Sequence, residues 1–272
     1  MNKTGQIVDV QSLIDFLERK GKNHLYYYHY TNWKSLGYIL NDHTFLLTRG
    51  NATFINDQHE ATMKGSYDMW VKTYIGSFAF GSSENMAMWG LYGLPKTDAV
   101  RISIPRAKMI AWLHSIDSVS LWINDKRDRR VQGCQSSLTD VIYISGTERN
   151  AVLTHGDSNW SINNVPGLRN VSQKPEMTGY IKNYAWHYEN EVRLRIVLPQ
   201  ESGAERICIE IPSDVVDSMI ITTGPNFEPK YQDQLYLSLM NKRRITESSF
   251  SGLIKYRTIC DLCKHDSFVP KK

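Results

Sequence analysis

Residues 25–31 have the sequence Leu-Tyr-Tyr-Tyr-His-Tyr-Thr, and residues 32–40 have the sequence Asn-Trp-Lys-Ser-Leu-Gly-Tyr-Ile-Leu. The first run is aromatic almost throughout, which favours a strand that is buried on both faces. The second run places its apolar residues at helical spacing. Thr31 stands where a helix N-cap belongs, because its hydroxyl can accept from an orphan backbone N–H. The stretch therefore predicts a strand, an abrupt turn and a helix.

His29 is expected at the end of this strand, beside the N-terminus of the helix. Exposed N–H groups at a helix N-terminus favour anions, so an imidazole delivered to that place suits a ligand site. A hydrogen-bonded histidine in an aromatic core explains the same pattern. Both interpretations remain open from this stretch alone.

The chain has 272 residues, of which 41% are hydrophobic, so its length suits one large domain or two small ones. No apolar run approaches the roughly 20 residues that span a bilayer. The first residues, Met1 to Gln6, lack the apolar segment of a signal peptide. We therefore expect a cytoplasmic protein with no membrane partner. The net charge of +4 is compatible with a polyanionic partner without requiring one.

The chain has four cysteines, and a disulfide framework is not expected in a cytoplasmic protein of this size. Cys260 and Cys263, followed by His265, have the spacing of metal ligands. A zinc site needs a fourth ligand, and none lies nearby in the sequence. We expect ordinary reduced thiols and no metal.

Predicted strands and helices alternate in the first half of the chain, and strands cluster in the second half, which favours an α+β fold with partly antiparallel sheets. We expect a helical lead-in over residues 1–24, a single α+β domain over 25–259 and a short tail over 260–272. Residues 175–186 are predicted to be helical. Residues 189–198 and 205–211 are bulky and branched, and we predict that they form a β-hairpin.

The common nucleotide-binding and hydrolase motifs are missing: no phosphate-binding Gly-rich loop, no His-Glu-x-x-His and no Gly-x-Ser-x-Gly is present. In a strand, Glu189, Glu191 and Arg193 would point to one face. An exposed, salt-bridged edge is one interpretation of this pattern. In the other, one carboxylate stabilises developing positive charge or holds a ribose hydroxyl, its neighbour orients a nucleophile, and Arg193 keeps both ionised.

Several motifs together resemble a widespread bacterial family that is known chiefly by a domain-of-unknown-function label and often lies near phage-defence genes. The motifs are Tyr28-His29-Tyr30-Thr31, Phe54-Ile55-Asn56-Asp57 with Glu60, Ser77-Phe78, Met88-Trp89 with Tyr92, and Trp186 with Tyr188-Glu189-Asn190-Glu191-Val192-Arg193. The resemblance spans roughly Leu25 to Thr223. Its layout is similar to that of ADP-ribosyltransferases, in which a first strand ends in His or Arg and a later strand opens with a catalytic Glu.

The resemblance implies an ADP-ribosyltransferase-like fold, with mixed and antiparallel sheets and flanking helices around a central cleft. It implies NAD as the cofactor and Glu191 as the catalytic residue, with Glu189 completing a Glu-x-Glu pair. The residues that it places against NAD are His29, Tyr30, Thr31, Asn56, Ser77, Tyr92 and Arg193. The combination of His29 with a Glu-x-Glu pair mixes features of two ADP-ribosyltransferase subclasses. In the strand that contains Ser77, Phe78 and Ala79 stand where the family pattern would have polar residues. The choice between Glu189 and Glu191 therefore stays open.

The expected function is an NAD-dependent ADP-ribosyltransferase, a bacterial toxin or phage-defence effector, whose acceptor is a nucleic acid such as RNA, or a protein. Release of nicotinamide passes through an oxocarbenium-like state that a carboxylate stabilises. Basic residues within 126–130 and 242–244 would contact the phosphates of a nucleic acid, although solvated surface explains them as well. A toxin of this kind would have a neutralising antitoxin protein.

Two other functions fit the same residues. The first is a non-catalytic module on the same fold that binds a nucleotide or RNA as a sensor. The second is a metal-dependent nuclease that uses Asp57, Glu60, Glu189 and Glu191.

Overall fold

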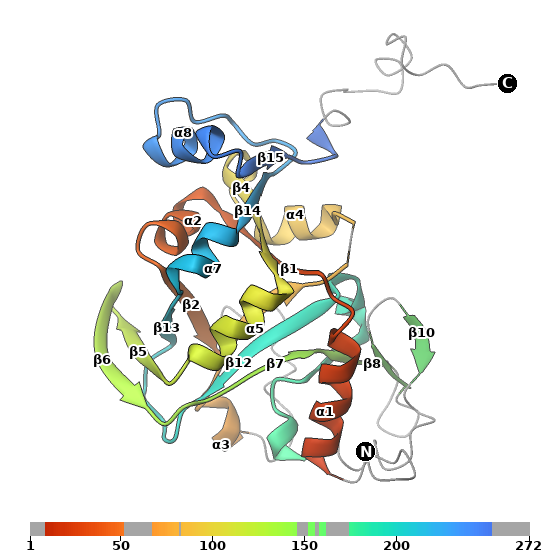
Figure 1. Ribbon diagram of the computed structural model, residues 1–272. Coiled ribbons are helices and arrows are strands. Elements are labelled where there is room, and N and C mark those ends of the chain that lie inside the picture. The colour runs from red at the N-terminus through yellow and green to blue at the C-terminus, as the bar shows by residue number, and fades with distance from the viewer. Residues whose placement is uncertain are drawn as a thin grey trace, which may run out of the picture. The chain divides into compact units, whose positions relative to one another are not determined.

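The computed structural model describes residues 9–51, 67–81, 83–145, 152–155, 158–161 and 174–251 (Figure 1). The fold is α+β, as predicted, and its strands pair mostly in antiparallel orientation. The chain divides into two compact units. Unit 1 comprises Met1–His29, Tyr38–Gly81 and Ile104–Ser218, and unit 2 comprises Tyr30–Gly37, Ser82–Ser103 and Met219–Lys272.

Unit 1 holds most of the strands. Its helices are α1 (Val10–Gly21), α3 (Tyr67–Trp70), α5 (Arg106–Ser115), α7 (Ser213–Ser218) and the short 3-10 helices η4 (Pro175–Met177) and η5 (Tyr184–Glu189). Its strands are the start of β1 (Tyr26–Asn32), then β2 (Thr44–Arg49), β3 (Thr73–Ala79), β5 (Ser118–Ile123), β6 (Lys126–Gln132), β7 (Gln135–Asp140), β8 (Ile142–Ser145), β9 (Val152–His155), β10 (Ser158–Ser161), β11 (Ile181–Asn183), β12 (Glu191–Val197) and β13 (Arg206–Glu210).

Strand β12 lies between β3 and β7 and pairs with both over most of its length. The other edge of β3 pairs with β1 at one end, where Tyr28 is opposite Ala79, and with β2 at the other. Beyond β2 the order continues through β13 and β5 to β6. A second sheet has the order β10-β9-β8-β11, and its β8 and β11 are parallel. β12 is therefore a central strand, which explains why its first six residues are buried.

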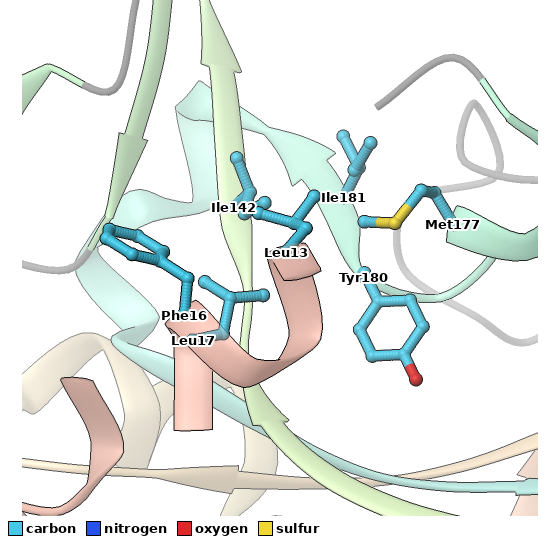
Figure 2. Packing of buried hydrophobic residues seen from close by; sticks show 7 residues of the cluster. All are labelled: Leu13, Phe16, Leu17, Ile142, Met177, Tyr180 and Ile181. Atoms are coloured by element: carbon cyan, nitrogen blue, oxygen red, sulfur yellow. The ribbon is translucent and has the colours of Figure 1, made fainter. Parts of the chain in front are cut away.

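The predicted N-terminal helix is present as α1, which belongs to unit 1. Leu13, Phe16 and Leu17 recur at helical spacing and are almost fully buried. Figure 2 shows these side chains packed with those of Ile142, Met177 and Ile181. Each buried Leu of this kind contributes about 1.5–3 kcal/mol relative to an exposed one. α1 is thus held by an apolar stripe that its sequence spacing predicts.

Unit 2 is smaller and built around β14 (Ile220–Thr223), which pairs antiparallel with β4 (Ala99–Pro105) and parallel with β15 (Ile245–Glu247). Its helices are α4 (Met86–Tyr92), the 3-10 helix η2 (Lys96–Asp98), α8 (Gln234–Asn241) and the first part of α2 (Trp33–Leu40). Trp33 packs against Phe227 and Tyr236, and its indole N–H donates to Asp233 at 2.9 Å. Trp33 therefore anchors the start of α2 inside unit 2.

The strand-turn-helix prediction for residues 25–40 is confirmed, but its boundary was wrong by one residue. β1 runs to Asn32, and the side-chain oxygen of Asn32, not the hydroxyl of Thr31, accepts from the backbone N–H of Ser35 at 2.9 Å. His29 consequently lies within the strand instead of at its end. Thr and Asn are both good capping residues, so two adjacent candidates left the boundary ambiguous in the sequence.

The predicted hairpin between β12 and β13 is wrong. Both edges of β12 are occupied by β3 and β7, whereas β13 pairs with β2 and β5. The helix predicted over 175–186 is also wrong, because that stretch forms η4, β11 and the start of η5. Local sequence patterns favour neighbours in the chain, whereas here long-range pairing decided the partners.

Some predictions fall on residues outside the described ranges, including those for Asn56 and for the pair Cys260 and Cys263. Among the helices that are described, none is both long and apolar enough to cross a membrane.

Candidate functional site

Glu191 opens the central strand β12 in unit 1, and its side chain is one of the most deeply buried carboxylates of the described residues, with 2% of the residue exposed. Arg193 follows two positions later on the same face of the strand and is 3% exposed. The interpretation of this segment as a solvated, salt-bridged edge is therefore wrong. The strand is central, and its charged residues face the interior.

The Glu191 carboxylate accepts hydrogen bonds from three side chains on three different strands. Ser77 on β3 donates its hydroxyl to Oε1 at 2.6 Å. Arg193 donates Nε to Oε1 at 2.7 Å and Nη2 to Oε2 at 3.1 Å. Lys182 on β11 donates Nζ to Oε2 at 3.0 Å. The backbone N–H of Glu191 donates to the Tyr143 hydroxyl at 2.8 Å, which fixes the start of the strand.

Glu189 reaches the same place by a different route from the one predicted. It ends η5 instead of lying in the strand, and Asn190 between the two glutamates has a left-handed backbone with φ 46°. The Glu189 carboxylate accepts from Lys182 Nζ at 2.5 Å, so this lysine bridges the two glutamates. The prediction that Glu189 shares a strand face with Glu191 is wrong, although the two carboxylates do come together.

We call Lys182, Glu189, Glu191 and Arg193 the charge cluster. All four side chains are at most 6% exposed. Burial alone would raise the pKa of Glu191, but Arg193 and Lys182 outweigh it, and with the Ser77 hydrogen bond they hold that pKa well below its usual range. The cluster therefore keeps an ionised carboxylate inside the protein at neutral pH.

Two residues of this arrangement were not found from the sequence. Lys182 lies opposite Tyr143 in the parallel pair of β11 and β8, and its ammonium is 5.1 Å from the centre of the Trp186 ring. Residues 175–186 were predicted to be helical, so Lys182 was not expected beside Glu191. Tyr143 belongs to no recognisable motif, so the sequence did not indicate it as a site residue. Arg193 also donates to the carbonyl of Gly179 at 3.0 Å. These contacts fix both cations before any ligand is bound.

Ser77 is an exposed residue that contacts the charge cluster. It is the exposed residue of β3, whose other residues are buried or half-buried. Its hydroxyl nevertheless donates to the buried Glu191 carboxylate. A ligand that reaches Ser77 would therefore lie one hydrogen bond away from Glu191.

His29 is linked to Ser77 but faces away from the carboxylate. Its Nδ1 lies 2.9 Å from the Ser77 carbonyl oxygen. Because a carbonyl oxygen can only accept, Nδ1 carries the proton and donates it. Its ring packs against Phe45 and Phe78 at centroid distances of 5.0 and 5.4 Å. Because side chains alternate along a strand, His29 shares a face with Phe78, whereas Ser77 and Glu191 occupy the other face. Ser77 therefore contacts both predicted residues. Its carbonyl accepts from His29 on one face of the sheet, and its hydroxyl donates to Glu191 on the other face.

Burial lowers the pKa of His29, and its hydrogen bond to Ser77 only partly opposes this. The histidine is therefore neutral in the folded protein at neutral pH. Its stabilising contribution is complete above the unfolded pKa of about 6.5 and is lost as the pH falls below that value. We expect His29→Gln, which keeps an N–H donor without titrating, to lose less unfolding free energy than the wild type between pH 7.5 and 5.5.

Urea unfolding at the two pH values measures this difference, with exposed His114→Gln as the matched control. The control should keep the wild-type pH dependence. Identical losses in the wild type and His29→Gln would show that His29 does not titrate as its surroundings predict.

The remaining predicted residues are not part of the charge cluster. Tyr30, Thr31 and Tyr92 belong to unit 2, and Asn56 lies outside the described residues. Tyr30 packs edge-on against Trp89 at 4.9 Å, and its hydroxyl accepts from the backbone N–H of Asn85 at 3.3 Å. Their contacts with NAD stay predictions. The structure thus brings together Ser77, Glu189, Glu191 and Arg193, and it connects His29 to them through Ser77.

Within the described ranges, no group of three or more His, Cys, Asp or Glu side chains is arranged to hold a metal ion. The carboxylates that a nuclease would require, Asp57 and Glu60, lie outside those ranges. Comparisons of the chain with protein-family models, curated protein sequences and solved structures gave no match.

Proposed function

We propose that this protein is an NAD-dependent ADP-ribosyltransferase in which Glu191 is the catalytic residue. The observation that supports the proposal is the buried, ionised Glu191 carboxylate, which accepts a hydrogen bond from Ser77, an exposed residue. Glu191 opens β12, as the resemblance implies for the catalytic strand, whereas His29 lies within β1 and not at its end. In the pairing β1-β3-β12, Ser77 lies on the strand between those of His29 and Glu191. Together they supply a fixed negative charge next to a residue that a ligand can reach.

The chemistry needs that charge at one stage. When the bond between nicotinamide and the ribose C1′ breaks, nicotinamide leaves with the electron pair and the ribose becomes cationic. An ionised carboxylate that is already in place stabilises this cation without reorganising. The acceptor nucleophile then bonds to C1′, and its proton passes to solvent water. In this proposal Glu189 is the second carboxylate, which orients that nucleophile. Lys182 and Arg193 keep the Glu191 carboxylate ionised.

The acceptor in this proposal is a macromolecule, RNA in preference to protein, and the biological role is that of a toxin or phage-defence effector with a protein antitoxin. Lys126 and Arg129 lie on the exposed strand β6, which pairs with β5 along one side. Exposed guanidinium and ammonium groups on such a strand suit phosphate contacts. Lys242 and Arg243, in unit 2, are exposed as well.

A second candidate is a non-catalytic module that binds a nucleotide. One observation favours it: both oxygens of the Glu191 carboxylate already contact cations, Arg193 and Lys182. A carboxylate neutralised in this way supports binding and structure more readily than it stabilises a new positive charge.

Purified protein incubated with NAD labelled in the adenylate phosphate, together with cellular RNA or cellular protein, separates these candidates. Label on either acceptor is expected if the protein is a transferase, and the acceptor that carries it settles the substrate class. Release of nicotinamide with no labelled acceptor would identify an NAD hydrolase instead. Binding of NAD with neither reaction would favour the non-catalytic module, and magnesium-dependent cleavage of the RNA would favour a nuclease.

A further inference from the structure

Unit 1 also contains a cavity of about 480 Å³ that the charge cluster does not line. It lies among β5, β6, β13 and the C-terminal end of α5, strands that Figure 1 shows next to one another. Its lining includes Arg127, Arg130, Asp117, Ser120, Cys208 and Glu210. A volume of this size is within the range of about 300–1,000 Å³ that is typical of small-molecule sites.

A β-bulge turns two arginines of β6 into this cavity. Ser120 is paired with Arg130 and Trp122 with Arg127, so β6 uses one residue more than β5 over the same distance. Ser120 and Trp122 are two positions apart and share a face of the sheet, and their partners therefore share it too. Without the bulge, residues 127 and 130 would point to opposite faces. The backbone thus places both guanidinium groups on one side.

The two arginines are held differently. Arg127 donates to Glu210 at 3.0 Å, to the Asp42 carbonyl at 3.4 Å and to the Thr44 hydroxyl, which fixes its orientation. Arg130 donates Nε to Ser118 at 2.7 Å, while its Nη2 stays 3.6 Å from the Asp117 carboxylate. The Arg130 side chain is 61% exposed, so its ion pair with Asp117 is weak and can exchange for a ligand.

The charges of the lining restrict the ligand. Two guanidinium groups suit one phosphate, because their planar N–H forks match its oxygens. Three acidic residues, Asp42, Asp117 and Glu210, belong to the lining of the same cavity. They repel a long polyanion but accept hydrogen bonds from hydroxyl and amino groups. We propose that this cavity binds a nucleoside monophosphate, with its phosphate on Arg130 and Arg127 and its ribose or base donors on the carboxylates.

Isothermal titration calorimetry of the full chain with AMP, GMP, CMP and UMP tests the proposal, with adenosine and inorganic phosphate as partial ligands. At least one nucleotide should bind more tightly than either partial ligand. Arg130→Ala should weaken that binding about tenfold or more, as expected for the loss of a charge-assisted hydrogen-bonded pair. Arg129→Ala is the matched control, since Arg129 is exposed on the same strand but outside the cavity lining, and it should change the affinity less than twofold.

Absence of binding by all four nucleotides, or equal effects of Arg130→Ala and Arg129→Ala, would overturn the proposal. The titration is repeated with Glu191→Gln to keep this result separate from the proposed enzymatic function. Unchanged binding by that variant supports a site of its own. Loss of binding with Glu191→Gln, together with normal binding by Arg130→Ala, would place the nucleotide at the charge cluster and refute the cavity site. A failure of ADP-ribose transfer alone would leave the cavity proposal standing.

Discussion

Glu191→Gln is expected to lower the rate of ADP-ribose transfer by a factor on the order of 10²–10³, the effect typical of removing a preorganised electrostatic group. Glutamine has nearly the shape of glutamate and can still accept from Ser77, but it carries no charge to stabilise the ribose cation. Single-turnover transfer of label from NAD measures the chemical step. Binding of NAD should change much less than the rate, because the charge acts mainly in the transition state.

Glu205→Gln is the matched control for this variant, since Glu205 is exposed and its replacement should leave the transfer rate unchanged.

The structure also predicts a loss of stability in Glu191→Gln that the sequence did not predict. Glu191→Gln leaves Arg193 and Lys182 buried with one anion fewer, so we expect a loss of about 1–3 kcal/mol in unfolding free energy. Folded Glu191→Gln protein with wild-type transfer would remove Glu191 from the mechanism.

Lys182→Met should have the largest effect on stability, about 3–5 kcal/mol, because it removes the cation that bridges two buried carboxylates. Methionine fills a similar volume, so the loss reports charge more than packing. Lys108→Met is the matched control. Lys108 also pairs with a carboxylate, Asp214 at 2.8 Å, but both partners are exposed, and such a pair is worth about 0–1 kcal/mol.

The effect of Lys182→Met depends on pH with a definite sign. In the wild type the folded-state pKa of Glu191 is held below its unfolded value, so the carboxylate adds stability above about pH 4.5, and this is lost as the pH falls further. Removing Lys182 takes away part of that stabilisation, with Arg193 still lowering the pKa. The gap in unfolding free energy between wild type and variant should be full at pH 7 and should narrow below pH 4.5.

Chemical unfolding across this range measures the gap, and a double variant gives an independent check. Lys182→Met with Glu189→Gln removes one cation and one anion, so it should be less destabilised than Lys182→Met alone. An equal or larger loss in the double variant, or a gap that does not change with pH, would mean that Lys182 acts through packing and not through its charge.

Local sequence patterns predicted the elements whose identity is set by nearby residues. The strand and helix of residues 25–40 and the helix α1 follow from aromatic content and apolar spacing, and both are present. The turn between β5 and β6 had a signal as well. Asn124 and Asp125 have positive φ angles of 51° and 57°, and such pairs are typical of two-residue hairpin turns. The charged run that follows was nevertheless not predicted as a strand, since nothing in it is apolar.

By itself, the sequence predicted the α+β class and singled out Glu189, Glu191 and Arg193 as polar residues of one predicted strand, and the family resemblance added Ser77. Only the tertiary structure decided that β12 is central, that Lys182 bridges the two glutamates and that His29 faces away from them. The physical reason is that hydrophobic spacing and capping act over a few residues. The partner of a strand edge and the counter-ion of a buried carboxylate come instead from segments far apart in the chain, which no local pattern specifies.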